Sequence, residues 1–109
     1  MVHDNVTFNK QDYTDKVIDG IEFDNCVFEA CNFTNTILSD KNFIDCKFKN
    51  CHFSLTKIIN SGFQEAEFKN CKILGLDFSL CNPYIFNPVF YNCIINYSNF
   101  GQSFQPVLH

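Results

Sequence analysis

The sequence contains no arginine, and its eight basic residues are all lysines, set against twelve acidic residues for a formal net charge of −4. This balance lacks the basic excess typical of phosphate-backbone binding, so we expect no direct nucleic-acid contact. The four glycines are scattered and form no glycine-rich phosphate loop, and neither a nucleophile elbow nor a Ser-His-Asp arrangement occurs. We therefore predict no catalytic residue, metal ligand or cofactor, and a chain that is not an enzyme.

Long apolar runs are absent as well. No stretch approaches the ~20 apolar residues of a membrane-spanning helix. The first nine residues lack the charged-then-apolar layout of a signal peptide. We therefore expect a soluble, cytoplasmic protein with no membrane contact.

The sequence does contain a large apolar or aromatic residue at every fifth position. From Phe8, fifteen successive positions follow this rule: Phe8, Tyr13, Ile18, Phe23, Phe28, Phe33, Leu38, Phe43, Phe48, Phe53, Ile58, Phe63, Phe68, Ile73 and Phe78. A second series, two residues earlier, is mostly small and includes Cys26, Cys31, Cys46, Cys51 and Cys71. Neither a helix nor a straight strand can hold such a series on one side. A chain that turns a corner every five residues can, which predicts a solenoid.

A longer period of twenty places like residues in columns. Phe28, Phe48 and Phe68 form one column, and successive coils would stack at the inter-strand spacing of roughly 4.8 Å. The runs FDNCVFEACNF and FIDCKFKNCHF resemble pentapeptide-repeat proteins, and the resemblance covers about residues 6–100. It implies an all-β fold, a right-handed quadrilateral β-helix. In its high cysteine content, the sequence resembles the branch of this family that includes quinolone-resistance and microcin-immunity proteins.

The five-residue spacing is interrupted once. After Phe78 it resumes at Ile85, Phe90, Ile95 and Phe100, which indicates a two-residue insertion near 80–82, interpreted as a bulge at one corner. We expect a single solenoid domain over residues 1–109 with about five coils. Residues 83–109 would form an uncharged C-terminal segment.

The seven cysteines favour packing over chemistry. Six of them lie in the inward small-residue series, and none forms a C-x2-C pair with nearby histidines. Free cysteine commonly behaves as a small buried hydrophobe. Metal binding and redox chemistry remain minor alternatives, and Cys81, in the insertion, is the one thiol expected to be reactive.

Charge divides the chain into two parts. Residues 1–45 hold nine acids and three lysines, whereas residues 46–109 hold three acids and five lysines. An acidic rod could imitate DNA, as the resemblance to gyrase-protecting relatives implies, so a DNA gyrase or topoisomerase protector is one hypothesis. The lysines that interrupt the acidic columns favour a non-enzymatic protein-binding scaffold with an unidentified partner, which is the preferred interpretation, with gyrase or topoisomerase protection or inhibition as the alternative. The candidate acidic binding surface comprises Asp12, Asp15, Asp19, Glu22, Asp24 and Glu29.

The last 32 residues contain no Asp, Glu, Lys or Arg. Aromatic and aliphatic residues at outward positions without charge are typical of an interface. In gyrase-protecting relatives the C-terminal end joins two chains, so the resemblance implies a homodimer here. The candidate interface comprises Tyr84, Phe86, Val89, Tyr91, Ile94, Tyr97 and Phe104. Two alternatives are a local cap built by Phe104, Pro106, Val107 and Leu108, and a chain that continues into further coils.

Overall fold

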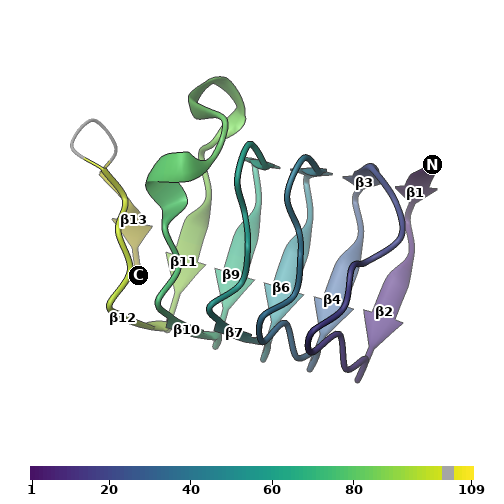
Figure 1. Cartoon of the computed structure of the whole chain (residues 1–109), viewed down its shortest axis with the longest axis horizontal. Coiled ribbons are helices and arrows are strands. Elements are labelled where there is room, and N and C mark those ends of the chain that lie inside the picture. Colours follow the sequence, from purple (N-terminus) through teal and green to yellow (C-terminus); the bar gives the residue numbers. More distant parts are fainter. Residues whose placement is uncertain (102–104) are drawn as a thin grey trace.

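The computed structural model describes residues 1–101 and 105–109. The chain winds into a four-sided parallel β-solenoid of about five coils, which follow one another along the long axis (Figure 1). Sheet A has the order β1 (Val2–Asp4), β3 (Glu22–Asp24), β5 (Asn42–Ile44) and β8 (Gly62–Gln64). Sheet B has the order β2 (Thr7–Asn9), β4 (Val27–Glu29), β6 (Lys47–Lys49), β9 (Glu67–Lys69), β11 (Val89–Tyr91) and β13 (Val107–Leu108).

The two remaining sides are less regular. Sheet C contains β7 (His52–Ser54), β10 (Lys72–Leu74) and β12 (Ile94–Asn96) and lies across the coil from sheet A. The fourth side is held by isolated bridges such as Val17 with Ile37 and Ile37 with Lys57. In residues 1–101 and 105–109, the helical segments are two single 3-10 turns, η1 (Phe78–Leu80) and η2 (Pro83–Ile85). Within the described residues, no helix has the length and apolarity needed to cross a membrane.

The interior confirms the five-residue period. The middle residue of each strand points inward, and Phe28, Phe48 and Phe68 are completely or almost completely buried. Their rings stack along the axis, with centroids 4.9 Å apart for Phe28 and Phe48 and 4.8 Å apart for Phe48 and Phe68. In-register pairing of β4, β6 and β9 produces this column, because each coil adds twenty residues.

From Asn5 to Gly75, each corner is a residue in the left-handed backbone region. Among the described residues, fifteen that are not glycine have φ between +51° and +61°, and together with Gly20 and Gly75 they recur every five residues as far as Gly75. Most are asparagine or aspartate, which tolerate this region better than other side chains do. Their side chains also bond from coil to coil, as in Asn35 Nδ2 to Asp15 Oδ1 at 2.8 Å and Asn92 Nδ2 to Asn70 Oδ1 at 2.7 Å. The corner column is therefore a second determinant of the fold.

Most of the inward small residues are cysteine, threonine or serine and act as hydrogen-bond donors between coils. Cys51 Sγ donates to the carbonyl of Phe28 at 3.2 Å, and Thr56 Oγ1 donates to that of Phe33 at 2.6 Å. The same relation, to a carbonyl 23 residues earlier, holds for Cys26, Cys31, Cys46, Cys71 and Cys81. A small side chain with a donor suits this position because it satisfies a carbonyl group beside the core.

The extra residues lie slightly later than the spacing indicated. Cys81 continues the small-residue series and is buried, five residues after Leu76. Phe86, and not Ile85, bridges to Phe63 and packs against the core. The additional segment is therefore the turn η2, and a shortened step of four residues from Phe86 to Phe90 restores the register. In Figure 1 this segment, drawn in green between β10 and β11, projects beyond the neighbouring coils.

Candidate functional site: two opposite faces of the rod

The candidate acidic residues do not share one face. Glu22 and Asp24 point outward from sheet A, whereas Glu29 lies on sheet B and accepts a hydrogen bond from Asn50 Nδ2 at 2.9 Å. Asp12 accepts hydrogen bonds from the backbone N–H and hydroxyl of Thr14, which lower its pKa. Asp15 stands at a corner beside Asn35, and Asp19 lies on the fourth side. Only Glu22 and Asp24 belong to a larger group.

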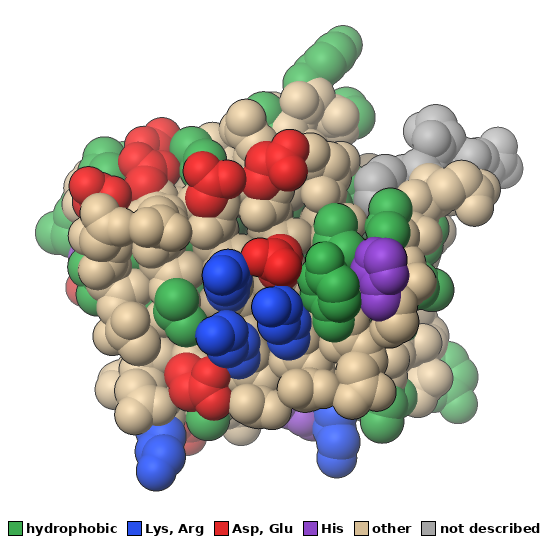
Figure 2. Space-filling model, turned by 180° about the vertical axis from the view of Figure 1, so that it is seen from behind, with side chains coloured by type: hydrophobic (Ala, Val, Ile, Leu, Met, Phe, Trp, Pro, Cys, Tyr) green, Lys and Arg blue, Asp and Glu red, His purple; other side chains and the backbone are tan. Residues whose placement is uncertain are grey.

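That group, the sheet A acidic face, consists of Asp4, Glu22, Asp24, Asp45 and Glu65. Asp4 and Asp24 are paired in register, and Asp45 and Glu65 occupy the corner that follows sheet A in the next two coils. The face therefore extends over four coils. Figure 2 shows acidic side chains in a row along one edge of the molecule. The sequence contains a trace of this face, because Asp4 and Asp24, and likewise Asp45 and Glu65, are twenty residues apart and therefore fall on the same side of successive coils.

Repulsion within this face is visible at two carboxylates. A hydrogen bond to Asp24, together with the charge of that group, raises the pKa of Glu22. Asp24 Oδ1 is buried and accepts no hydrogen bond, and the same is true of Asn42 Oδ1 on the next strand. Negative charge is thus concentrated on sheet A at some expense of stability.

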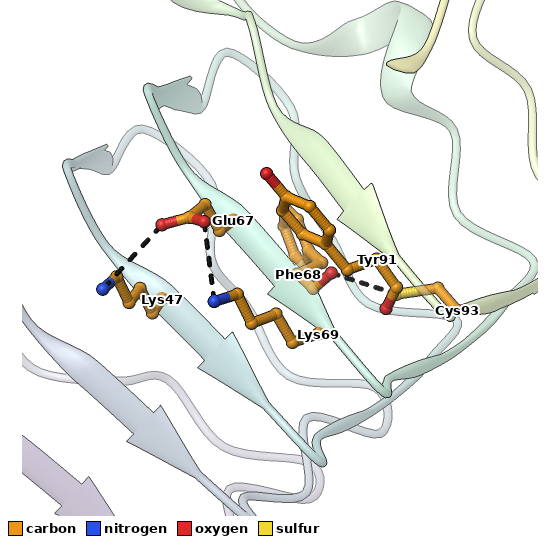
Figure 3. A network of polar contacts seen from close by, with 6 residues as sticks. All are labelled: Lys47, Glu67, Phe68, Lys69, Tyr91 and Cys93. Atoms are coloured by element: carbon orange, nitrogen blue, oxygen red, sulfur yellow. Dashed lines mark hydrogen bonds and ion pairs between the residues drawn. The ribbon is translucent and has the colours of Figure 1, made fainter. Parts of the chain in front are cut away.

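Sheet B carries the opposite charge at its centre. Lys47 and Lys69 share the carboxylate of Glu67, with nitrogen–oxygen distances of 4.0 Å and 3.7 Å (Figure 3). Lys69 also lies 5.3 Å from the ring centroid of Tyr91, whose other neighbour is the stacked ring of His109. The cluster is a surface ladder in which exposed ion pairs contribute little individually.

The candidate dimer residues are spread over several sides. Tyr84 stands on the projecting turn and is 93 % exposed. Val89 and Tyr91 lie on sheet B, and Phe86 points toward the core. Ile94 lies on sheet C, and Tyr97, 91 % exposed, occupies the next corner. Phe104 lies outside the described residues.

Ile94 and Tyr97 belong to an exposed apolar group that the sequence did not reveal, the sheet C apolar patch. It consists of Leu55, Leu74, Ile94 and Tyr97, with exposed fractions of 59 %, 39 %, 54 % and 91 %. Backbone hydrogen bonds join the coils that carry them, from Leu55 N to Leu74 O and from Gly75 N to Asn96 O, both at 3.0 Å. Leu55, Leu74 and Tyr97 therefore lie at one corner of the last three coils, and Ile94 extends the patch to the start of β12, next to Lys72 of β10.

The C-terminal strand caps part of the rod. Val107 and Leu108 form β13, which pairs with β11, and the carbonyl of His109 accepts a hydrogen bond from Asn92 N at 2.8 Å. This agrees with the local cap considered for Val107 and Leu108, and it leaves the sheet C apolar patch uncovered.

The described residues contain no group of three or more His, Cys, Asp or Glu side chains arranged to hold a metal ion. Cys81 is not the accessible thiol that its position suggested, since burial raises its pKa to about 12. Cys93 is the only partly exposed cysteine, because it occupies the last thiol position of its column. The geometry thus supports surfaces for binding and packing.

A right-handed β-helix with stacked phenylalanines and a corner every fifth residue defines a repeat solenoid. A family model described as a pentapeptide repeat region matches residues 21–100, and the chain belongs to this family. Among solved structures, it is similar to full-length QnrB1, a plasmid-mediated fluoroquinolone resistance protein. The identity is 20 %, the TM-score is 0.42, and the match covers 93 % of this chain and 61 % of that one.

A trypsin-treated variant of QnrB1 matches with 19 % identity and a TM-score of 0.37, over 92 % of this chain and 58 % of that chain. This chain therefore spans about three fifths of the QnrB1 chains it matches. The curated proteins gave no match.

Proposed function

We propose that the chain is a non-enzymatic protein-binding module that works as a homodimer joined through its C-terminal coils. The observation that carries the proposal is the position of two unlike surfaces on opposite sides of one rod. The sheet C apolar patch suits a second copy, because its four side chains are apolar or aromatic and exposed. The sheet A acidic face then points away from the dimer axis and is free to meet another protein.

Sedimentation tests the dimer. The double variant Ile94→Glu/Tyr97→Glu should sediment as a folded monomer, because two charges in an apolar interface lose their hydration without a partner. Tyr84→Glu is the matched control: it alters an equally exposed tyrosine outside the patch and should stay dimeric. A wild-type chain that is monomeric at tens of micromolar, roughly the dissociation constant of a weak dimer, would overturn the dimer.

A more specific proposal is protection or inhibition of DNA gyrase. It is supported by the acidic side chains that follow sheet A through four coils, and by the sequence resemblance to quinolone-resistance proteins. Reversing Glu22, Asp24, Asp45 and Glu65 to lysine should abolish any effect on supercoiling, whereas reversing Asp12, Asp15 and Glu29 should not. The effect should also weaken with salt, since the Debye length is about 10 Å at 0.1 M. Supercoiling unaffected by a large excess of wild-type protein would leave the general binding role alone.

A further inference from the structure

The turn η2 departs from the repeat, and its geometry is well defined. Three residues, Pro83, Tyr84 and Ile85, are added between the buried Cys81 and the core residue Phe86. Proline at the first position fixes φ, and Asn82 Oδ1 caps the turn by accepting the Tyr84 N–H at 3.0 Å. The local sequence thus favours this one conformation.

The turn is also held against sheet A on both sides. Asn87 donates to Glu65 Oε1 and accepts from the Glu65 N–H, both at 2.7 Å. Ile85 packs over Gly62, where an added Cβ would lie 2.7 Å from Ile85 Cγ1 and 2.6 Å from Asn42 Oδ1. Gly62 has no positive φ, so the close approach of Ile85 is the physical reason for glycine in β8.

At the tip of this turn, Tyr84 is 93 % exposed, and its side chain makes no hydrogen bond or ring contact with a described residue. A tyrosine on a rigid turn loses little conformational freedom on binding, and tyrosine is enriched among residues that dominate interface energies. The turn therefore presents an aromatic ring that the fold itself does not use.

The surroundings of the turn are acidic. The Glu65 carboxylate accepts a hydrogen bond from Asn87, and Asp45 occupies the same corner one coil earlier. On the other side, a depression of about 190 Å³ is lined by Ile85 together with Glu22, Asp40, Lys41 and others. A cationic group approaching the Tyr84 ring would thus be attracted by carboxylates on both sides.

We propose that the segment Asn82–Asn87 is a docking element for a partner protein with a basic surface, in which an arginine side chain packs on the ring of Tyr84 and neighbouring cations face Asp45 and Glu22. Arginine fits best because its planar guanidinium stacks on aromatic faces and pairs with carboxylates. The inference rests on the proposed protein-binding role and adds the chemistry of the partner.

Titration with a synthetic arginine-rich peptide tests it, with binding measured by calorimetry at low salt. Tyr84→Leu should weaken binding about two- to fivefold, the range expected for one exposed cation–π contact, whereas Tyr84→Phe should bind within twofold of wild type. Tyr91→Leu, which removes the sheet B ring beside Lys69 and outside both proposed surfaces, is the control and should leave the affinity for the peptide unchanged. A lysine-rich peptide of equal charge should bind more weakly.

Equal affinity of Tyr84→Leu and wild type would overturn the docking role of the turn. If Asp45→Asn and Glu22→Gln still weakened binding in that case, the proposed acidic binding face would stand without it. No binding of the arginine peptide to the wild type would overturn the partner chemistry. Sedimentation of the same variants measures dimerisation independently of peptide binding, so failure of the proposed dimer can be distinguished from failure of the proposed docking turn.

Discussion

At the residue scale, two kinds of side chain specify the coil, and they do so at different points of the repeat. The central phenylalanine is defined by burial, whereas the corner residue is defined by backbone conformation. Lys10, Ala30, Leu55, Glu65 and Tyr97 occupy corners although their side chains do not favour positive φ. Each of these five corners should be under backbone strain.

Ala30→Asn should therefore raise the free energy of unfolding by about 0.5–1 kcal/mol, because asparagine tolerates the left-handed region. The reverse substitution two coils later, Asn70→Ala, should lower it, since that residue has φ +54° and accepts a hydrogen bond from Asn92. Urea denaturation of both variants measures the two effects. The same sign for both would contradict the role of the corner.

The buried thiols give a pH-dependent contribution to stability. Burial raises the pKa of Cys46 to about 12, whereas a thiol in the unfolded chain ionises near pH 8.5 (approximately). Between these values the unfolded state has released a proton that the folded state keeps. The contribution of Cys46 should thus be fully present below about pH 8.5 and decline as the pH rises toward 12.

The difference in free energy of unfolding between wild type and Cys46→Ala should therefore be smaller at about pH 10 than at about pH 7. These two pH values lie on either side of the pKa of an unfolded thiol, about 8.5. Chemical denaturation at the two pH values measures this stability difference. Alanine is a suitable replacement because Ala66 already occupies the equivalent inward position one coil later and is buried there. A difference that does not change with pH would contradict the buried, protonated thiol.

At the element scale, each three-residue strand is too short to be stable alone and depends on the coil on either side. The phenylalanine column of sheet B illustrates this. Phe48 has ring partners in both neighbouring coils, Phe28 and Phe68, whereas Phe8 in the first coil stacks on Phe28 on one side. Phe48 is fully buried and Phe8 is partly exposed.

Phe48→Ala should lower the free energy of unfolding by about 3–5 kcal/mol, because it leaves a cavity between two stacked rings. Phe8→Ala removes the same atoms at a partly solvated position and should cost clearly less. Thermal or urea unfolding followed by far-ultraviolet circular dichroism compares them. Equal losses would show that the coils do not behave as a stack of nearest neighbours.

The sequence predicted these columns well, because burial of phenylalanine leaves a strict trace every five and twenty residues. It did not locate the added turn, since Ile85 and Phe86 are both apolar and spacing alone favoured Ile85. The structure assigns Phe86 to the core because Asn82 and Pro83 form a separate turn first. The sequence did not reveal the sheet C apolar patch because Leu55 and Tyr97 are far apart in the chain and are brought to the same side only when the corners of successive coils stack.

At the scale of the whole molecule, charge is divided between faces more than between ends. Sheet A carries carboxylates through four coils, whereas the lysines Lys47 and Lys69 of sheet B pair with Glu67 on their own sheet. Glu65 extends the acidic face into the part of the chain where the sequence alone indicated a basic excess. The rod therefore presents unlike surfaces in different directions, as a binding module with more than one partner would.

Screening should make this arrangement more stable. Raising the salt concentration from about 10 mM to 150 mM shortens the Debye length from roughly 30 Å to 8 Å and should increase the free energy of unfolding. Asp24→Asn should itself stabilise the protein and reduce this salt dependence, since it removes one of two carboxylates paired in register.

Asp12→Asn is the matched control, because the Asp12 carboxylate is held by Thr14 and its pKa is lowered. That variant should give no gain in stability. Urea denaturation at the two salt concentrations compares all three proteins. A larger gain for Asp12→Asn than for Asp24→Asn would contradict repulsion on sheet A.

The hydrogen bond from an inward cysteine, threonine or serine to the preceding coil has a consequence for how such a chain can change length. Where a donor is present in the regular coils, it reaches a carbonyl 23 residues earlier, so every regular coil presents the next one with the same set of acceptors. A tandem duplication of sixty bases of coding sequence would therefore add one coil of about 4.8 Å without creating a mismatched junction. Growth in steps of twenty codons leaves both neighbours intact, whereas an insertion of any other size must, like the turn at Pro83, form a loop.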